Sequence, residues 1–261
     1  MHPLRLYGVY LDHSLRQQMQ YRANMLLRIG SQCLITGVEF LGIWALFDRF
    51  GTLPGWGLAE VAVLYGIVQV GFGLSAMFGR SFDTFGGMLR RGEFDRLLLR
   101  PRGTLLQLFG AQCCLRRIGN LLQGGAVLGW GLSQVALVEA WWSWPMLVVT
   151  VLGCGSFFLS LWILQATSCF WTTEGMEAWN VLTHGGNTLA SYPLTCYQPW
   201  LQRLVTWVLP IALVTYFPTL VLLDRSDSLW HALAPLSGGV TLLLAMAAWR
   251  LGLRRHASTG S

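Results

Sequence analysis

Residues 145–170 read PMLVVTVLGCGSFFLSLWILQATSCF, a continuous apolar run without a charged side chain. A helix needs about 20 mostly apolar residues to cross the hydrocarbon core of a bilayer, and this run is long enough. Trp141, Trp142 and Trp144 precede it, and indole rings are favoured at the membrane interface. The stretch therefore predicts a membrane-spanning helix in an integral membrane protein.

The composition of the whole chain agrees with this class. Of the 261 residues, 54% are hydrophobic and 11% are charged, against about 25% charged in a typical soluble protein. The mean hydropathy is +0.49. So few charged side chains cannot cover the apolar surface of a soluble fold of this size. Composition therefore excludes a soluble domain, a disordered chain and a small disulfide scaffold.

The basic residues exclude a nucleotide-binding loop that depends on lysine. All 18 are arginines, and the sequence contains no lysine. A nucleotide-binding loop of the GxxxxGK[ST] type needs its lysine on the phosphates, so any use of ATP and Mg must be supplied by another chain, and we expect no cofactor on this one. The sequence also contains no catalytic motif and no His, Cys and carboxylate cluster at metal spacing. We expect no catalytic residue, no metal site and no nucleic-acid partner.

Five apolar runs are clear candidates for membrane spans. They are Ile29–Phe47, Leu58–Gly79, Ile118–Val138, Pro145–Phe170 and His231–Leu251.

Residues 176–223 allow two interpretations. In the first, residues 176–197 are a loop and residues 201–223 a fifth span that is kinked at Pro210 and Pro218. In the second, residues 176–197 are a polar fifth span, followed by a proline-broken hairpin that enters the membrane and returns. Both give six transmembrane helices in an all-α protein with one transmembrane domain over residues 1–261.

Arginine placement predicts the orientation. Fifteen arginines lie in the amino-terminal segment, in the loop over residues 80–117 and in the carboxy-terminal segment, whereas Arg49 and Arg225 fall on the other side. Because positive flanks stay in the cytoplasm, both termini are expected there. Residues 1–28 have apolar side chains at helical spacing, which predicts an amphipathic helix that lies along the inner leaflet or packs on a partner subunit.

Glu39 is the most informative single charge, because an ionisable group in the middle of a span is expensive. It either forms a hydrogen bond to a neighbouring helix or lines a pathway. His184 and Glu177 suggest a proton relay, although a loop or a polar helix edge explains them as well.

The loop over residues 80–117 contains GEFDRLLLRP at residues 92–101, which predicts a short helix over residues 93–100 that stops at Pro101. One interpretation is a positively charged flank that contacts lipid head groups. A flank needs only arginines, however, and here acidic and apolar residues alternate with them. This favours a helix that couples to a cytoplasmic protein, with the side chains of Glu93, Phe94, Asp95, Arg96, Leu97 and Arg100 making the contact, and Phe94 and the leucines filling a groove on the partner.

Four stretches together resemble a known family: residues 21–24 (YRAN), 92–101, 191–193 (SYP) and 209–218 (LPIALVTYFP). In order and spacing they are similar to the ABC-2 type permeases, within them to six-span bacterial exporter subunits. The resemblance implies two separate cytoplasmic ABC ATPase subunits, a second permease, identical or related, and the inner membrane of a bacterium. It also favours the second interpretation of residues 176–223, with Pro210, Tyr216 and Pro218 in a re-entrant hairpin on the outer side.

The function that the resemblance implies is export of a hydrophobic or amphipathic substrate by alternating access, driven by the ATPase subunits. Two other classes stay open. One is a membrane-embedded enzyme that acts on a lipid through Glu39 or His184, which requires several polar groups to converge inside the membrane. The other is a membrane anchor for a cytoplasmic partner that transports nothing.

Overall fold

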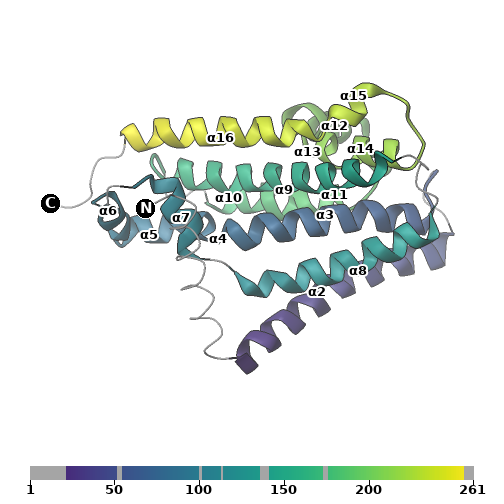
Figure 1. Ribbon diagram of the computed structural model, residues 1–261, viewed down its shortest axis with the longest axis horizontal. Coiled ribbons are helices and arrows are strands. Elements are labelled where there is room, and N and C mark those ends of the chain that lie inside the picture. The colour runs from purple at the N-terminus through teal and green to yellow at the C-terminus, as the bar shows by residue number, and fades with distance from the viewer. Residues whose placement is uncertain are drawn as a thin grey trace.

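The computed structural model describes residues 22–51, 55–99, 102–112, 114–135, 141–172 and 176–255, and every regular element in these ranges is a helix (Figure 1). The amphipathic helix expected over residues 1–28 falls mostly outside them. Only its last residues are described, as the start of α2.

Five long helices follow the long axis of the molecule in Figure 1. They are α2 (Arg22–Phe50), α3 (Leu58–Phe78), α8 (Ile118–Gln134), α9 (Ser143–Ser168) and α16 (Leu236–Arg255). By length and composition, α2, α3, α9 and α16 are able to cross a membrane, which confirms four of the expected runs as helices of that kind. Helix α8 has 17 residues and ends before the expected bound at Val138.

Short helices gather at one end of the bundle, at the left of Figure 1, which we call the arginine-rich end. They are α4 (Arg80–Asp83), α5 (Phe85–Arg90), α6 (Glu93–Leu98), α7 (Thr104–Ala111) and a 3-10 turn (Leu115–Arg117). Helix α6 begins at Glu93 as expected, since Gly92 has a φ of 65°, a left-handed conformation that glycine adopts easily and that separates α6 from α5. It ends at Leu98, and Arg100 and Pro101 lie outside the described residues.

The segment over residues 176–190 is helical rather than a loop. It consists of α10 (Met176–Asn180), a π-helical stretch (Val181–Gly185) and α11 (Gly186–Ala190). Its 15 residues extend about 22 Å at 1.5 Å per residue, and whether it crosses the membrane stays a prediction.

A bent pair of helical segments follows. The first is α12 (Pro199–Arg203) with a π-helical stretch (Leu204–Val208), and the second is α13 (Ile211–Val214) with α14 (Tyr216–Leu222). The two are bent by 71° at a break that contains Pro210, so they form one broken span or a re-entrant loop. Pro218 is the third residue of α14, where a missing N–H is tolerated. Helix α15 (Leu229–Leu233) then leads into α16.

Helix α3 is the centre of the bundle, packed against α8 and α9. Of its 21 residues, 14 are buried, including Tyr65, Gln69 and Phe72. Close packing depends on glycines, because a Cβ on Gly66 would lie 2.7 Å from the Cα of Leu128. Helix α2, by contrast, exposes most of its apolar side chains, among them Leu34, Ile35, Val38 and Leu41.

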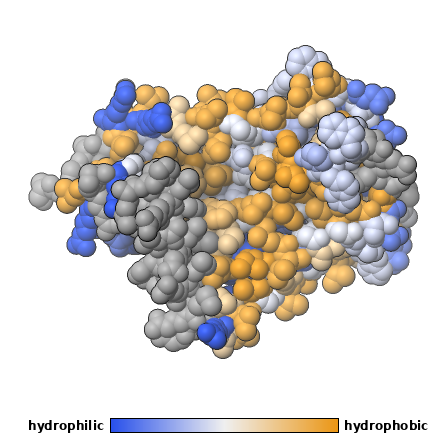
Figure 2. All heavy atoms as spheres, viewed as in Figure 1, coloured by the Kyte–Doolittle hydropathy of each residue, from blue (hydrophilic) through white to orange (hydrophobic). Residues whose placement is uncertain are grey.

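The surface supports a membrane setting. Figure 2 shows hydrophobic residues across the middle of the visible face and hydrophilic residues towards both ends. Helices α2, α9 and α16 contribute many of the exposed apolar side chains, as an outer surface in contact with acyl chains requires.

Candidate functional site

A polar cavity of about 160 Å³ lies between α2, α3 and α11. It is lined by Glu39, Ile43, Tyr65, Gln69, Asn187, Thr188, Ser191 and Tyr192. Glu39 is 17 residues from the start of α2, a helix of 29 residues, so the cavity lies near the middle of the bundle rather than at an end. The structure thus brings Glu39 together with the polar segment at residues 176–190 and with the SYP stretch.

Tyr65 positions Glu39. The Tyr65 hydroxyl donates a hydrogen bond to the backbone carbonyl of Thr36 at 2.8 Å, one turn before Glu39 on α2. The Phe40 ring packs on the Tyr65 ring with 5.4 Å between centroids. These contacts fix α2 against α3 on both sides of Glu39, so its carboxyl is held at the cavity by buried neighbours.

Glu39 itself has no partner among the described residues. Among the residues that the structure describes, no hydrogen bond or ion pair is formed by its carboxylate. The side chain is exposed in this chain. Its carboxylate lies close enough to the Tyr65 and Tyr192 hydroxyls to interact with them electrostatically. The expectation of a hydrogen bond from a neighbouring helix is therefore not met by any described residue.

Two amide oxygens add to the polar character of the cavity. Gln69 is 1% exposed, and its Oε1 has no hydrogen-bond partner; the Oδ1 of Asn187 is likewise buried and unpaired. A buried acceptor without a donor costs free energy, so such positions in native proteins have a water or a ligand as partner. The cavity therefore contains unpaired hydrogen-bond acceptors.

A second set of polar residues, His184 and Arg117, lies towards the arginine-rich end. His184 contacts the rings of Phe72 and Trp162, with centroids 5.6 and 5.8 Å away, and Arg117 lies 5.7 Å from the Phe72 centroid. Burial, reinforced by the neighbouring Arg116, lowers the pKa of Arg117. His184, Asn187 and Ser191 follow one another at spacings of three and four residues, so a polar stripe leads from this group to the Glu39 cavity.

His184 does not form an acid–base pair with Glu39 among the described residues. His184 is not among the residues that line the Glu39 cavity, and the side chain of Glu177 lies outside the described part of the chain. Within that part, no three His, Cys, Asp or Glu residues are placed to hold a metal ion.

The loop helix α6 needs a correction. Phe94 is 0% exposed, and its ring packs against Phe85, Phe170 and Trp249 at centroid distances of 4.9, 5.8 and 6.2 Å. The expectation that Phe94 fills a groove on a partner is wrong for this structure, because the ring fills a groove of its own chain.

The exposed apolar residues of this segment are Leu98 and Leu99, which are 40% and 85% exposed. Asp95 and Leu97 are partly buried, whereas Glu93 and Arg96 are exposed. The guanidinium of Arg91 donates to Glu93 at 2.7 Å, and this hydrogen bond lowers the pKa of the Glu93 carboxyl. The surface of α6 is therefore charged, with an apolar tip at its end.

The residues expected in a hairpin lie at the opposite end of the bundle. The Tyr216 ring contacts the Trp56 ring at 5.6 Å, and Arg225 lies 4.8 Å from the Trp56 centroid. Arg225 also forms an ion pair with Glu60 at 2.5 Å. We call the set of Trp56, Glu60 and Arg225 the clamp, since it fastens the end of the bent pair to the start of α3.

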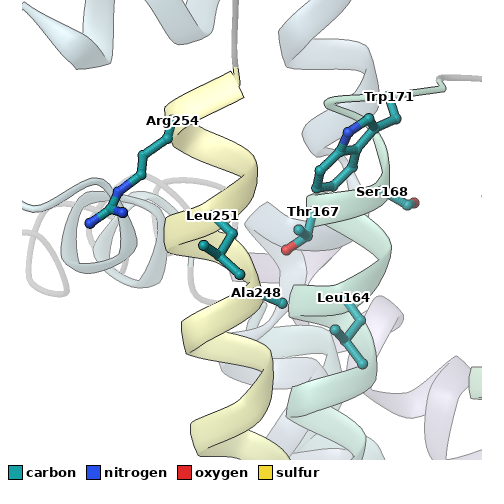
Figure 3. Close-up of a pocket in the computed structure, with 7 residues that line it drawn as sticks. All are labelled: Leu164, Thr167, Ser168, Trp171, Ala248, Leu251 and Arg254. Carbon is teal, nitrogen blue, oxygen red and sulfur yellow. The ribbon is translucent and has the colours of Figure 1, made fainter.

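A larger cavity of about 530 Å³ lies between α9 and α16 near the arginine-rich end (Figure 3). Its two hydroxyl groups, on Thr167 and Ser168, are bonded to carbonyls of their own helix. In Figure 3 the Arg254 side chain extends away from α9, on the far side of α16. The cavity is therefore an apolar groove without a charge directed into it, and the polar cavity at Glu39 is the better candidate.

Sequence reasoning singled out Glu39 but missed Tyr65 and Gln69, because an apolar helix buried on all sides has no periodicity that marks one face. Asn187 and the SYP stretch carried signals, the first as a polar residue in a weak span and the second through the resemblance.

Comparison with known proteins gives one match. The family described as ABC-2 family transporter protein matches residues 33–260 of the chain. No curated protein and no solved structure matches it.

Proposed function

Because this chain belongs to the ABC-2 transporter family, we propose that it is the permease subunit of an exporter in the inner membrane of a bacterium. The substrate is hydrophobic or amphipathic, and the energy comes from ATP hydrolysis on two cytoplasmic ATPase subunits. The arginine-rich end and both termini face the cytoplasm, in keeping with the distribution of positive charge.

The observation that carries the proposal is the unpaired, exposed Glu39 in the middle of α2. A carboxylate at that depth is costly against acyl chains, and such groups face a polar interior or a pathway. The face of α2 that bears Glu39 therefore borders a pathway. A second permease, identical or related, closes this pathway from the other side, and the substrate passes beside α2, α3 and the bent pair.

The burial of Phe94 supports a coupling between the ATPase and the membrane helices in which Phe94 itself does not contact the ATPase. Phe94 of α6 packs on Phe170, just after α9, and on Trp249 of α16. Because cores are close-packed, a displacement of α6 moves the ends of these helices with it. The exposed tip at Leu98 and Leu99 contacts the ATPase, and closure of the two ATPases drives the change between inward-open and outward-open states.

The test is a charge placed on the tip. Leu99→Glu should leave membrane insertion intact, since Leu99 is 85% exposed, but should reduce by at least tenfold the ABC ATPase that purifies with the chain and its ATP hydrolysis. Leu229→Glu is the matched control, because Leu229 is 71% exposed at the opposite end and should have no effect.

Three outcomes would contradict the proposal or a part of it. If Leu99→Glu retains full assembly and hydrolysis, the ATPase contact lies elsewhere. If the purified chain without a partner hydrolyses ATP, the separation of transport and hydrolysis between chains is wrong. An assembly that hydrolyses ATP but moves no substrate in proteoliposomes would favour a membrane anchor.

A further inference from the structure

We propose that the Glu39 cavity binds the protonated amine of a cationic amphiphile, which makes such amines the substrate class of the exporter. This inference deepens the proposed function and rests on it. It follows from the kinds of polar atoms that the cavity presents and from those that it lacks.

Three acceptors at the cavity have no partner among the described residues. The Glu39 carboxylate has no described partner, and Gln69 Oε1 and Asn187 Oδ1 are buried without one. The Tyr65 hydroxyl does not serve them, because it donates to the Thr36 carbonyl. The Ser191 hydroxyl likewise donates to the backbone carbonyl of Asn187 at 2.9 Å. A ligand with hydrogen-bond donors satisfies these acceptors, but the Tyr192 hydroxyl and the amide nitrogens of Gln69 and Asn187 are donors at the same cavity, so the charge of Glu39 selects the ligand.

The charge of the cavity points the same way. No arginine or histidine lines it, so the negative charge of Glu39 is not balanced by this chain's described residues. An ammonium group supplies the positive charge and up to three N–H donors together. An anionic ligand would instead lie against an unscreened carboxylate in a low-dielectric setting, which is unfavourable.

Aromatic rings complete the site. Tyr65 and Tyr192 both line the cavity, and ring faces attract cations. A cavity of about 150 Å³ admits a molecule of the size of benzene, so about 160 Å³ holds a head group rather than a whole amphiphile. The apolar part of the ligand then lies along the exposed apolar side chains of α2.

The experiment measures binding to the purified full chain in nanodiscs of zwitterionic lipid, without an ATPase. Three probes share a twelve-carbon tail: dodecylammonium, dodecyltrimethylammonium and dodecyl sulfate. The first carries a positive charge and N–H donors, the second only the charge, and the third a negative charge. Equilibrium dialysis with empty nanodiscs as background gives the affinity of each.

We expect dodecylammonium to bind at least tenfold more tightly than dodecyl sulfate, with dodecyltrimethylammonium in between. Glu39→Gln should remove the preference for the cation, while Asp48→Asn, which removes the same charge from the exposed end of the same helix, should keep it. Gln69→Leu should reduce the difference between the two cations. An unchanged thermal midpoint and elution volume would show that each variant is folded.

Three results would overturn the inference: equal binding of cation and anion, unchanged selectivity in Glu39→Gln, or dissociation of a permease dimer by Glu39→Gln, which would show that the carboxylate pairs with the second copy. Failure of the proposed function looks different, because binding would then be cation-selective while ATP-driven movement of dodecylammonium is absent. A fourth result, ATP-driven transport of a substrate without charge selectivity, would overturn this inference but leave the proposed function intact.

Discussion

Helices α2 and α3 follow each other in the chain and are both apolar enough to cross a membrane, yet they are packed in opposite ways. Within this chain, 78% of the apolar part of α3 is buried but only 11% of that of α2. Helix α3 is packed against α8 and α9 and also contacts α11 and α14, whereas α2 contacts mainly α8 and the turn before it. The difference teaches that α3 organises the fold of one chain, while α2 leaves most of its apolar surface free, which is the surface that we propose for contact with lipid or a second permease.

Each helix carries one glutamate that follows the same division. Glu60 of α3 is paired with Arg225 and accepts a hydrogen bond from the backbone N–H of Gly57 at 2.7 Å. Glu39 of α2 has no described partner. We interpret Glu60 as structural and Glu39 as functional, and substitutions in both helices test the contrast between α2 and α3 and between their glutamates.

The largest effect is expected from Gly66→Val on α3. A Cβ at this position would lie 2.7 Å from the Cα of Leu128, so α8 would have to move, at a cost of about 3 kcal/mol. Gly37→Val on α2 meets no atom within 4 Å and should change stability by less than about 0.5 kcal/mol. Thermal midpoints of the detergent-solubilised variants, read by size-exclusion chromatography, compare the two. Equal midpoints would break the contrast between the helices.

A smaller effect is expected from Glu60→Gln. The ion pair is partly buried, with side-chain exposures of 33% for Arg225 and 19% for Glu60, so its loss should cost about 2 kcal/mol. Arg225→Gln should cost a similar amount, and the double variant should cost less than the sum, since the two side chains interact. Strict additivity in this cycle would show that Glu60 and Arg225 do not interact energetically across the clamp.

The smallest effect on stability is expected from Glu39→Gln. No described hydrogen bond or ion pair is lost, so the thermal midpoint should change by less than about 0.5 kcal/mol in equivalent free energy. A loss as large as that of Glu60→Gln would show that Glu39 has a structural partner after all.

Much of the fold was predictable because it depends on local properties. Four apolar runs became helices of membrane-spanning length, α6 begins at Glu93 after Gly92, and Pro210 lies at the break in the bent pair. Six crossings and the orientation of the termini stay predictions.

What could not be predicted depends on contacts between distant residues. The burial of Phe94 is set by Phe170 and Trp249, which lie far along the chain, and a helix of six residues is too short to reveal a buried face by periodicity. Glu39 stood out because an ionisable residue within an apolar run is rare. Tyr65 and Gln69 did not stand out, because the sequence does not indicate which helix each of these side chains faces. That is decided only by the packing of the bundle.

The burial of α3 has a consequence for how this multi-pass membrane protein is made. Helix α3 carries the polar side chains of Gln69 and Ser75 on surfaces that α8, α9 and α11 later cover, and α8 begins 40 residues after α3 ends. At about 5–20 residues per second, the ribosome completes that interval in about 2–8 s. During this time α3 has no partner but α2, and its amide side chain would face acyl chains. The nascent chain thus needs the insertion machinery to shelter α3 until α8 arrives, and a chain truncated before residue 118 should be a substrate for membrane quality control.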